Sequence, residues 1–354
     1  MINLIRRLAF ALPLILVGLW VVSYFLLASP EHRYTPVTDA QKQMAREYLA
    51  PILPDMPAGW QWSELEVEPG IKLRTGKISA ENPKGTIVIA SGYSAPIETS
   101  SKAIIRFHQA GYSVAALDRR GQGKSWRPLP NPEKGYVKDY AEYSADLHAF
   151  LKQQQGPVFV YAISQGAHVA LRMAGEHAPD VKAYALVVPM VKIKTEPWPY
   201  RVAGAISSFY ALTGQGDYYS IGRRDWDINN ITFGSPTTCN PNPKTAQMRD
   251  ALVTLDPQLR ISGTTNQWVH ATMASTLKIT SLVFRAKINK PVLMFNAGDK
   301  ETYVNPDAAR QMCNGLRNCR SVDYPKASHC ITIEDPAVGD DIRDRTLAFF
   351  ATHN

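Results

Sequence analysis

The turn AISQG at residues 162–166 limits what this chain can fold into more than any other stretch. Before it, PVFVY is a β-branched and aromatic run with the length of a buried strand, and after it AHVALRMAG is typical of a helix packed on a sheet. A strand, a tight turn with a central Ser and a helix together are the setting of a nucleophile elbow. Because that turn strains the backbone, the residues two positions to either side of the Ser must be small, as Ala162 and Gly166 are. We therefore predict that Ser164 is a nucleophile.

Strand-like and helix-like runs alternate around this turn. Buried strands are expected at 86–90, 112–117, 157–161 and 183–188, an edge strand at 71–78, and helices at 99–110 and 140–153. Late in the chain the alternation resumes, with strands at 291–295 and 321–324 and a helix at 338–350. This order predicts an α/β fold with a mostly parallel central sheet and helices on both faces.

The stretch 191–288 interrupts the alternation. It is rich in aromatic residues, and Gly, Pro and Asn break it repeatedly. We interpret it as a cap inserted over the active site, whose aromatic residues mostly form its own core while a few line an acyl-binding cleft. The core is then expected in two parts, at 66–190 and 289–354.

The N-terminal residues 1–30 are expected to lie outside this fold. Arg6 and Arg7 precede 21 uncharged residues at 8–28, which is long enough to cross a bilayer as a helix. We predict an uncleaved, single-pass membrane anchor with the Arg pair in the cytoplasm, so that the rest of the chain lies on the periplasmic or extracellular side. A cleaved signal peptide would lead to the same compartment. Residues 31–65 are interpreted as a linker and N-terminal extension, with a helix at 38–49.

Cysteine content and charge agree with that compartment. Cys313 and Cys319 could close a small loop, which would leave Cys239 and Cys330 as a second pair, but four cysteines allow three pairings and the sequence does not choose among them.

The net charge of +8 is moderate and spread out, which argues against a nucleic-acid partner and favours an anionic membrane. No Cys/His spacing is typical of a metal site, so we expect neither a metal nor a cofactor. The sequence makes no prediction of oligomeric state.

A Ser nucleophile needs a base, and the base needs a carboxylate that holds its tautomer. In a fold of this kind the chain order is Ser, acid, His. His329 follows the last expected strand and is our candidate for the base, whereas His168 is expected to pack within the protein. In the loop after the strand at 291–295, both Asp299 and Glu301 could be the acid, and the residues alone leave this choice open.

An oxyanion needs two backbone N–H donors. Gln165, directly after the nucleophile, is expected to supply one, and Tyr93, in the loop after the strand at 86–90, the second. A further histidine, His270, lies in the expected cap, where a structural role is the better interpretation.

Several segments together resemble a known family. They are the elbow, DRRGQGKS at 118–125 and NPEKGYV at 131–137, with weaker similarity in NQWV at 266–269 and in the closing FFATHN. From about residue 84 to its end the chain resembles the α/β-hydrolases, and within them the bacterial lysophospholipase and monoacylglycerol lipase branch. The resemblance implies an α/β-hydrolase fold with a catalytic triad.

Two positions depart from the family's usual residues. The family's acid lies three residues after the loop glycine and three before a Val, which is Glu301 in this chain, where the family usually has Asp. The oxyanion loop often reads His-Gly, and here it is Ser91-Gly92. Because a backbone donor survives that change, we expect catalysis to survive it too.

The resemblance also implies an activity. We expect a serine hydrolase that cleaves carboxylic esters of single-chain lipids, lysophospholipid or monoacylglycerol, through an acyl-enzyme on Ser164. An acyltransferase or a thioesterase would use the same triad. A lipid-binding protein without activity on a hydrolase fold is the alternative outside enzymes.

Overall fold

The computed structural model of the chain describes residues 14–15, 17–22 and 34–354. Within these residues no helix is both long and apolar enough to cross a membrane. Most of the expected anchor at 8–28 lies outside the described residues, so the anchor stays a prediction.

The centre of the molecule is an eight-stranded sheet in the order β1-β2-β4-β3-β5-β6-β7-β8. Its strands are β1 (Gln61–Glu68), β2 (Ile71–Ile78), β3 (Thr86–Ala90), β4 (Ser113–Leu117), β5 (Val158–Ile163), β6 (Val181–Val187), β7 (Val292–Ala297) and β8 (Cys319–Tyr324). The six strands from β4 to β8 are parallel, whereas β1, β2 and β4 pair antiparallel. The predicted α/β fold with a mostly parallel sheet is confirmed.

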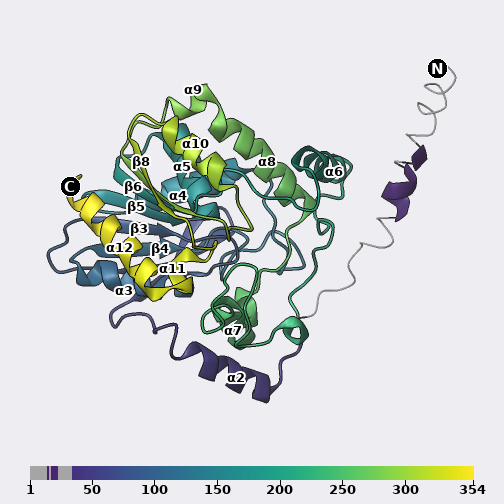
Figure 1. Ribbon diagram of the computed structural model, residues 1–354, viewed down its shortest axis with the longest axis horizontal. Coiled ribbons are helices and arrows are strands. Elements are labelled where there is room, and N and C mark those ends of the chain that lie inside the picture. The colour runs from purple at the N-terminus through teal and green to yellow at the C-terminus, as the bar shows by residue number, and fades with distance from the viewer. Residues whose placement is uncertain (1–13, 16, 23–33) are drawn as a thin grey trace.

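Helices cover both faces of this sheet (Figure 1). One face packs against α4 (Tyr140–Leu151), α5 (Gln165–His177) and α10 (Pro306–Asn314), and the other against α3 (Ser101–Gln109) and α12 (Pro336–Ala351). Alternate residues of a strand point to opposite faces: in β5, Val160 joins the first core, and Phe159 and Tyr161 join the second. Because both faces are covered, the inner parallel strands are largely apolar runs, which is why they could be predicted, whereas the outer strand β8 carries polar, partly exposed residues.

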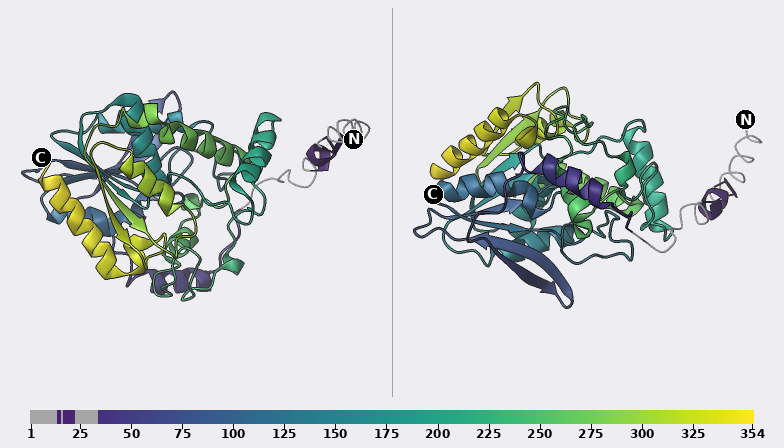
Figure 2. Two further views of the ribbon diagram at one scale, coloured as in Figure 1. Left: turned by 45° about the horizontal axis from the view of Figure 1, so that its top comes forward. Right: turned by 90° about the horizontal axis from the view of Figure 1, so that it is seen from below.

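The expectation that residues 71–78 form an edge strand was wrong. β2 lies between β4 and β1, and β1 forms the edge, although the sequence placed most of it in a linker. The two strands make a hairpin that extends from the body (Figure 2, right). β1 is exposed along most of its length, and only Leu65 and Val67 are partly buried against the core, so it lacks the continuous apolar signal of the inner strands.

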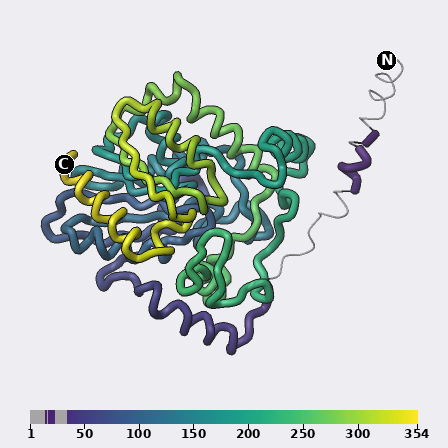
Figure 3. Tube along the Cα trace, viewed as in Figure 1, coloured from purple at the N-terminus to yellow at the C-terminus, as the bar shows by residue number. Residues whose placement is uncertain are grey.

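The expected helix near residue 38 is α2 (Asp39–Leu49). Thr38 caps it: the Thr38 hydroxyl accepts a hydrogen bond from the Gln41 N–H, and the Gln41 side chain accepts one from the Thr38 N–H. α2 packs beside α7 (Met248–Leu255), as the trace in Figure 3 shows.

Between β6 and β7 the chain leaves the sheet for residues 191–288, which we call the cap segment. It contributes helices and loops but no strand of the sheet: α6 (Tyr200–Leu212), α7, α8 (Asn266–Thr280), α9 (Leu282–Arg285) and the short 3-10 turns η2 (Ile228–Asn230) and η3 (Pro257–Leu259). The remaining short elements are η1 (Ile97–Ser100) and α11 (Ile331–Glu334). Trp226 is buried in a small cluster with other residues of this segment, as expected for a core of its own, whereas Trp268 packs into the core on one face of the sheet. The division of the chain into core and cap domains stays a prediction.

Residues 34–37, which precede α2, lie against the cap segment. The Thr35 hydroxyl donates a hydrogen bond to the Trp226 carbonyl at 3.0 Å, and the Arg260 Nη1 donates one to the Thr35 carbonyl at 3.0 Å. The Arg260 guanidinium in turn lies 4.2 Å from the ring centre of Trp226. The chain is therefore attached to the cap segment before it enters the core.

Candidate active site

Ser164 lies at the turn between β5 and α5, with φ 52° and ψ −114°. A positive φ is unfavourable for a residue with a side chain, so the surroundings must hold this turn. The Ser164 N–H donates to the Val187 carbonyl at 2.9 Å. A Cβ on Gly166 would lie 2.0 Å from the carbonyl oxygen of Ala90, so only glycine fits there. The turn therefore has the geometry and the small neighbour expected of a nucleophile elbow.

The structure brings three distant residues into one hydrogen-bonded line. The Nε2 of His329, in the loop after β8, lies 2.9 Å from the Ser164 Oγ. The Nδ1 of the same ring lies 2.7 Å from the Oε2 of Glu301, in the loop after β7. The imidazole can thus accept the Ser164 proton at one nitrogen while the carboxylate accepts a hydrogen bond from the other.

Of the two candidate acids, Glu301 is the one in this line, and Asp299 is exposed on the same loop. Glu301 is buried, and its Oε1 accepts hydrogen bonds from the N–H groups of Tyr303 at 2.7 Å and Val304 at 3.0 Å. Burial raises the pKa of Glu301, but the hydrogen bond and charge of His329 and the two N–H donors outweigh it, so the pKa is lowered. The carboxylate is therefore ionised at neutral pH.

Contacts with the cap segment hold the loop that carries His329. Cys330 forms a disulfide with Cys239, and the Ser328 hydroxyl donates to the Cys239 carbonyl at 2.6 Å. The second disulfide joins Cys313 and Cys319, so the structure selects one of the three possible pairings. The sequence could not, because α10 and β8 bring one pair together and a contact between core and cap segment the other.

Two backbone amides lie beside Ser164 without an acceptor. Gln165 is the first residue of α5, so no carbonyl of the helix is available to its N–H. Gly92 approaches the nucleophile so closely that a Cβ there would lie 3.4 Å from the Ser164 Cβ, which places the following amide, that of Tyr93, near the same site. Neither N–H donates a hydrogen bond to any residue in the described part of the chain. Both are thus available for a bound oxygen.

Two further histidines, His168 and His270, lie outside this line. His168 is buried between the Met190 carbonyl and the Ser275 hydroxyl, each 2.7 Å from a ring nitrogen, and burial lowers the pKa of His168 to about 4. His270 contacts the Ser208 hydroxyl at 2.8 Å within the cap segment.

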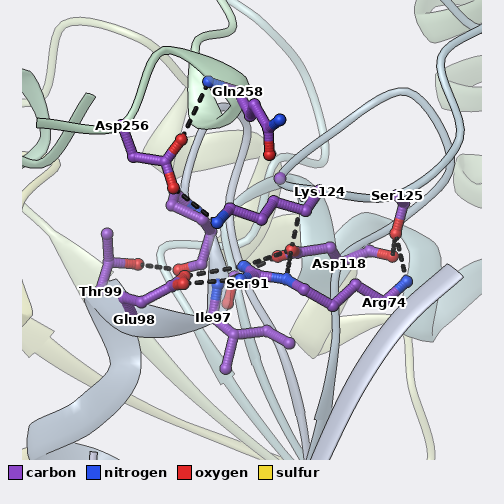
Figure 4. Close-up of polar contacts among 12 residues, drawn as sticks. Arg74, Ser91, Ile97, Glu98, Thr99, Asp118, Lys124, Ser125, Asp256 and Gln258 are labelled. Atoms are coloured by element: carbon purple, nitrogen blue, oxygen red, sulfur yellow. Dashed lines mark hydrogen bonds and ion pairs between the residues drawn. The ribbon is translucent and has the colours of Figure 1, made fainter. Parts of the chain in front are cut away.

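A network beneath the site holds the loop 118–125, to whose residues the sequence assigned no individual role (Figure 4). The buried Asp118 carboxylate accepts hydrogen bonds from Arg74 Nε at 2.6 Å, from the Ile97 N–H at 3.0 Å and from the Lys124 N–H at 3.0 Å. Charged residues directly after a buried strand were the signal available in the sequence. Asp118 therefore fixes the loop that also carries Arg119.

Comparisons with known proteins identify a family and several similar proteins. Residues 81–336 match the family model described as "Serine aminopeptidase, S33" (Hydrolase_4). Lysophospholipase L2 of Escherichia coli (strain K12) is 25% identical over 297 residues, which cover 80% of this chain and 85% of that protein.

Solved structures share the fold. A monoacylglycerol lipase from Paleococcus ferrophilus superposes with a TM-score of 0.63 at 17% identity, covering 80% of this chain and 99% of that one. A soluble variant of monoglyceride lipase from Saccharomyces cerevisiae, in complex with a substrate analog, gives a TM-score of 0.63 at 17% identity over 85% of this chain and 98% of that one. Because the family model spans most of the chain, and the sheet and its connections agree with it, this protein belongs to the Hydrolase_4 family of α/β-hydrolases.

Proposed function

We propose that this protein is a serine hydrolase that cleaves carboxylic esters of single-chain lipids, lysophospholipid or monoacylglycerol, through an acyl-enzyme on Ser164. The observation that carries the proposal is the hydrogen-bonded line from Ser164 through His329 to Glu301, beside the two free amides of Gln165 and Tyr93. The names of the similar proteins, a lysophospholipase and two monoacylglycerol lipases, support the class of substrate.

In the proposed reaction, His329 Nε2 takes the Ser164 proton as the Oγ attacks the ester carbonyl carbon. The N–H groups of Tyr93 and Gln165 stabilise the negative charge on the carbonyl oxygen, and Glu301 stabilises the imidazolium. The imidazolium then gives its proton to the departing alcohol, which leaves the acyl group on Ser164. Water, deprotonated by His329 in the same way, releases the fatty acid and restores the hydroxyl.

The cap segment offers an apolar surface suited to lipid. α6 has mostly apolar residues, yet Ser207 is its one fully buried member. Trp198, Val202 and Leu212, at or near this helix, are 46%, 41% and 79% exposed. An amphipathic or apolar helix on the surface of a lipid hydrolase can lie against the bilayer interface, where the substrate resides.

We further propose that residues 8–28 anchor the protein in a membrane, with the remainder on the periplasmic or extracellular side. The two disulfides suit an oxidising compartment. Part of the apolar stretch also lies next to the cap segment: the Trp20 indole N–H donates to the Thr213 carbonyl at 3.4 Å, and the Gln215 amide donates to the Trp20 carbonyl at 3.3 Å.

The proposal is tested with a fluorophosphonate probe and a substrate panel. Wild-type protein should be labelled on Ser164 and should hydrolyse lysophospholipids, monoacylglycerols or p-nitrophenyl esters, whereas Ser164→Ala should do neither. Ser101→Ala, at a buried serine on the far face of the sheet, is the matched control and should behave as wild type.

Four outcomes would contradict the proposal. An unlabelled wild-type protein that binds lipid would indicate a lipid-binding protein without activity. Turnover of an aminoacyl p-nitroanilide without turnover of any ester would indicate a peptidase. Transfer of the acyl group to an added alcohol or amine in preference to water would instead identify an acyltransferase, and selective cleavage of acyl thioesters a thioesterase.

A further inference from the structure

A buried arginine lies behind the two free amides of the site. Arg119 follows β4 in the loop 118–125, is 4% exposed, and uses its guanidinium to join two segments that are distant in the sequence. Its Nη1 donates to the Ser91 carbonyl, and its Nη2 donates to the Gly92 carbonyl at 2.8 Å and to the Gln165 side-chain oxygen at 2.9 Å. One side chain therefore contacts both the loop that carries Tyr93 and the residue that follows the nucleophile.

The acceptors around this guanidinium are neutral. Within the described part of the chain, Arg119 donates only to backbone carbonyls and side-chain amides, the last being Gln122 at 3.3 Å. The neighbouring Arg120, by contrast, forms an ion pair with the buried Asp146 at 2.6 Å. Burying a cation that is bonded to no carboxylate is unfavourable, and burial lowers the pKa of Arg119, although the guanidinium stays protonated. The Tyr143 ring, whose centre lies 5.8 Å from the guanidinium, and the charge of Asp118 offset part of this cost. If the side chain served only as a structural contact, a neutral residue would make it with a smaller free-energy cost of burial.

The Gly92 carbonyl and the Tyr93 N–H belong to the same peptide group. A cationic donor on the carbonyl end withdraws electron density from the group and makes its N–H a stronger donor. Gln165 is constrained in a similar way, because its side-chain oxygen also accepts from Gln122 Nε2 at 2.8 Å and its side-chain nitrogen donates to the Tyr140 hydroxyl at 2.9 Å. Both free amides are thus fixed before a substrate arrives.

We propose that Arg119 is a positioning residue for the oxyanion site: its guanidinium fixes the 92–93 peptide group and Gln165, and its positive charge, which is bonded to no carboxylate, favours negative charge on the ester oxygen. The inference rests on the proposed function, because that charge develops only if Ser164 attacks a carbonyl. In a site sheltered from water such a charge acts over a longer range than it would at the surface.

The experiment compares a ligand that places an oxyanion in the site with one that cannot. A trifluoromethyl ketone with a lipid chain forms a tetrahedral adduct on Ser164 and carries an oxyanion. An ether analogue of the lipid substrate binds in the ground state without a carbonyl. A variant that loses affinity for the ketone alone is therefore defective in the oxyanion site. If Arg119 had a merely structural role, its replacement would weaken the binding of both ligands.

For Arg119→Met we expect kcat/KM and the affinity for the ketone to fall in parallel by about 10- to 100-fold, somewhat less than the loss of an oxyanion donor itself. The affinity for the ether analogue should stay within about threefold. Arg119→Lys keeps the charge and should recover part of the loss. Arg120→Lys is the matched control, with kcat/KM expected to be unchanged.

A folded Arg119→Met protein that binds the ketone as tightly as wild type, or that loses both ligands equally, would overturn the inference. If Arg119→Lys lost as much kcat/KM as Arg119→Met, the proposed role of the positive charge would be overturned. If the methionine variant does not fold, Arg119→Gln, which is neutral but polar, is judged by the same criteria. Absence of fluorophosphonate labelling in the wild type would refute the proposed function instead, so the two failures are distinguishable.

Discussion

Cys330, the neighbour of His329, is covalently joined to Cys239 in the cap segment, 91 positions earlier in the chain. Ser328, which precedes His329 in the sequence, donates a hydrogen bond from its hydroxyl to the carbonyl of the same Cys239. The position of the expected catalytic base is therefore set by the cap segment as well as by the sheet.

Removing this disulfide should affect both stability and turnover. For Cys239→Ala/Cys330→Ala we expect a loss of about 2–5 kcal/mol in the free energy of unfolding, because a long loop is no longer closed, together with a reduced kcat. Cys313→Ala/Cys319→Ala opens a loop with a sequence separation of only 6 and lies away from His329, so its kcat should stay near wild type. Urea denaturation and ester kinetics measure the two effects. Equal kcat values in the two variants would show that the link does not position His329.

The choice between the two acids has a direct kinetic test. Glu301→Gln removes the charge that stabilises the imidazolium and permits the wrong tautomer, so kcat should fall by about 10²- to 10⁴-fold. Asp299→Asn, at an exposed position of the same loop, should leave kcat within about twofold. The reverse order of effects would contradict the geometry seen here.

Because His168 is buried, the free energy of unfolding should depend on pH in the acid range. Its pKa is lowered to about 4 in the folded protein, whereas the unfolded chain protonates it near 6.5. The unfolded state therefore binds more protons between these values, and the associated stability is fully present above pH 6.5 and is lost as the pH falls toward 4. The difference is about 3 kcal/mol at most. His168→Gln should flatten this part of the curve of unfolding free energy against pH, and an unaltered slope would contradict the assignment.

Gly166 should tolerate no side chain. A methyl group there would lie 2.0 Å from the Ala90 carbonyl oxygen, so Gly166→Ala must displace the elbow or β3 and should lower the melting temperature and abolish labelling of Ser164. Gly204→Ala is the control on another helix, where the new methyl meets the movable end of Met273 and helix propensity improves. Similar melting temperatures for the two variants would argue against a strained elbow.

What could be predicted from the sequence follows from how local each signal is. The elbow at Ser164 is specified by five consecutive residues and their flanks, and buried parallel strands by continuous apolar runs. Glu301 and His329 were found because each follows a strand whose end lies at the same edge of the sheet.

Features that depend on long-range packing were missed or left open. β1 has only two residues partly buried against the core, which is too short a pattern to identify a strand, and the pairing of Cys239 with Cys330 depends on how the cap segment meets the core. Arg119 and Arg120 are adjacent identical residues, yet one contacts carbonyls and the other a carboxylate. Only the folded chain distinguishes them, because the backbone of a loop decides where each side chain points.

The attachment of Thr35 to Trp226 and Arg260 limits how far the folded protein can lie from a membrane. If the apolar stretch that ends at Ala28 crosses a bilayer, about six residues separate the lipid boundary from this clamp, and a fully extended chain of that length measures about 20 Å. This connecting segment would then be too short for the folded protein to move far from the membrane surface. A lipid molecule would pass from the leaflet to the protein over less than the thickness of the bilayer itself, so local lipid supply rather than diffusion through water would govern how often the site is filled.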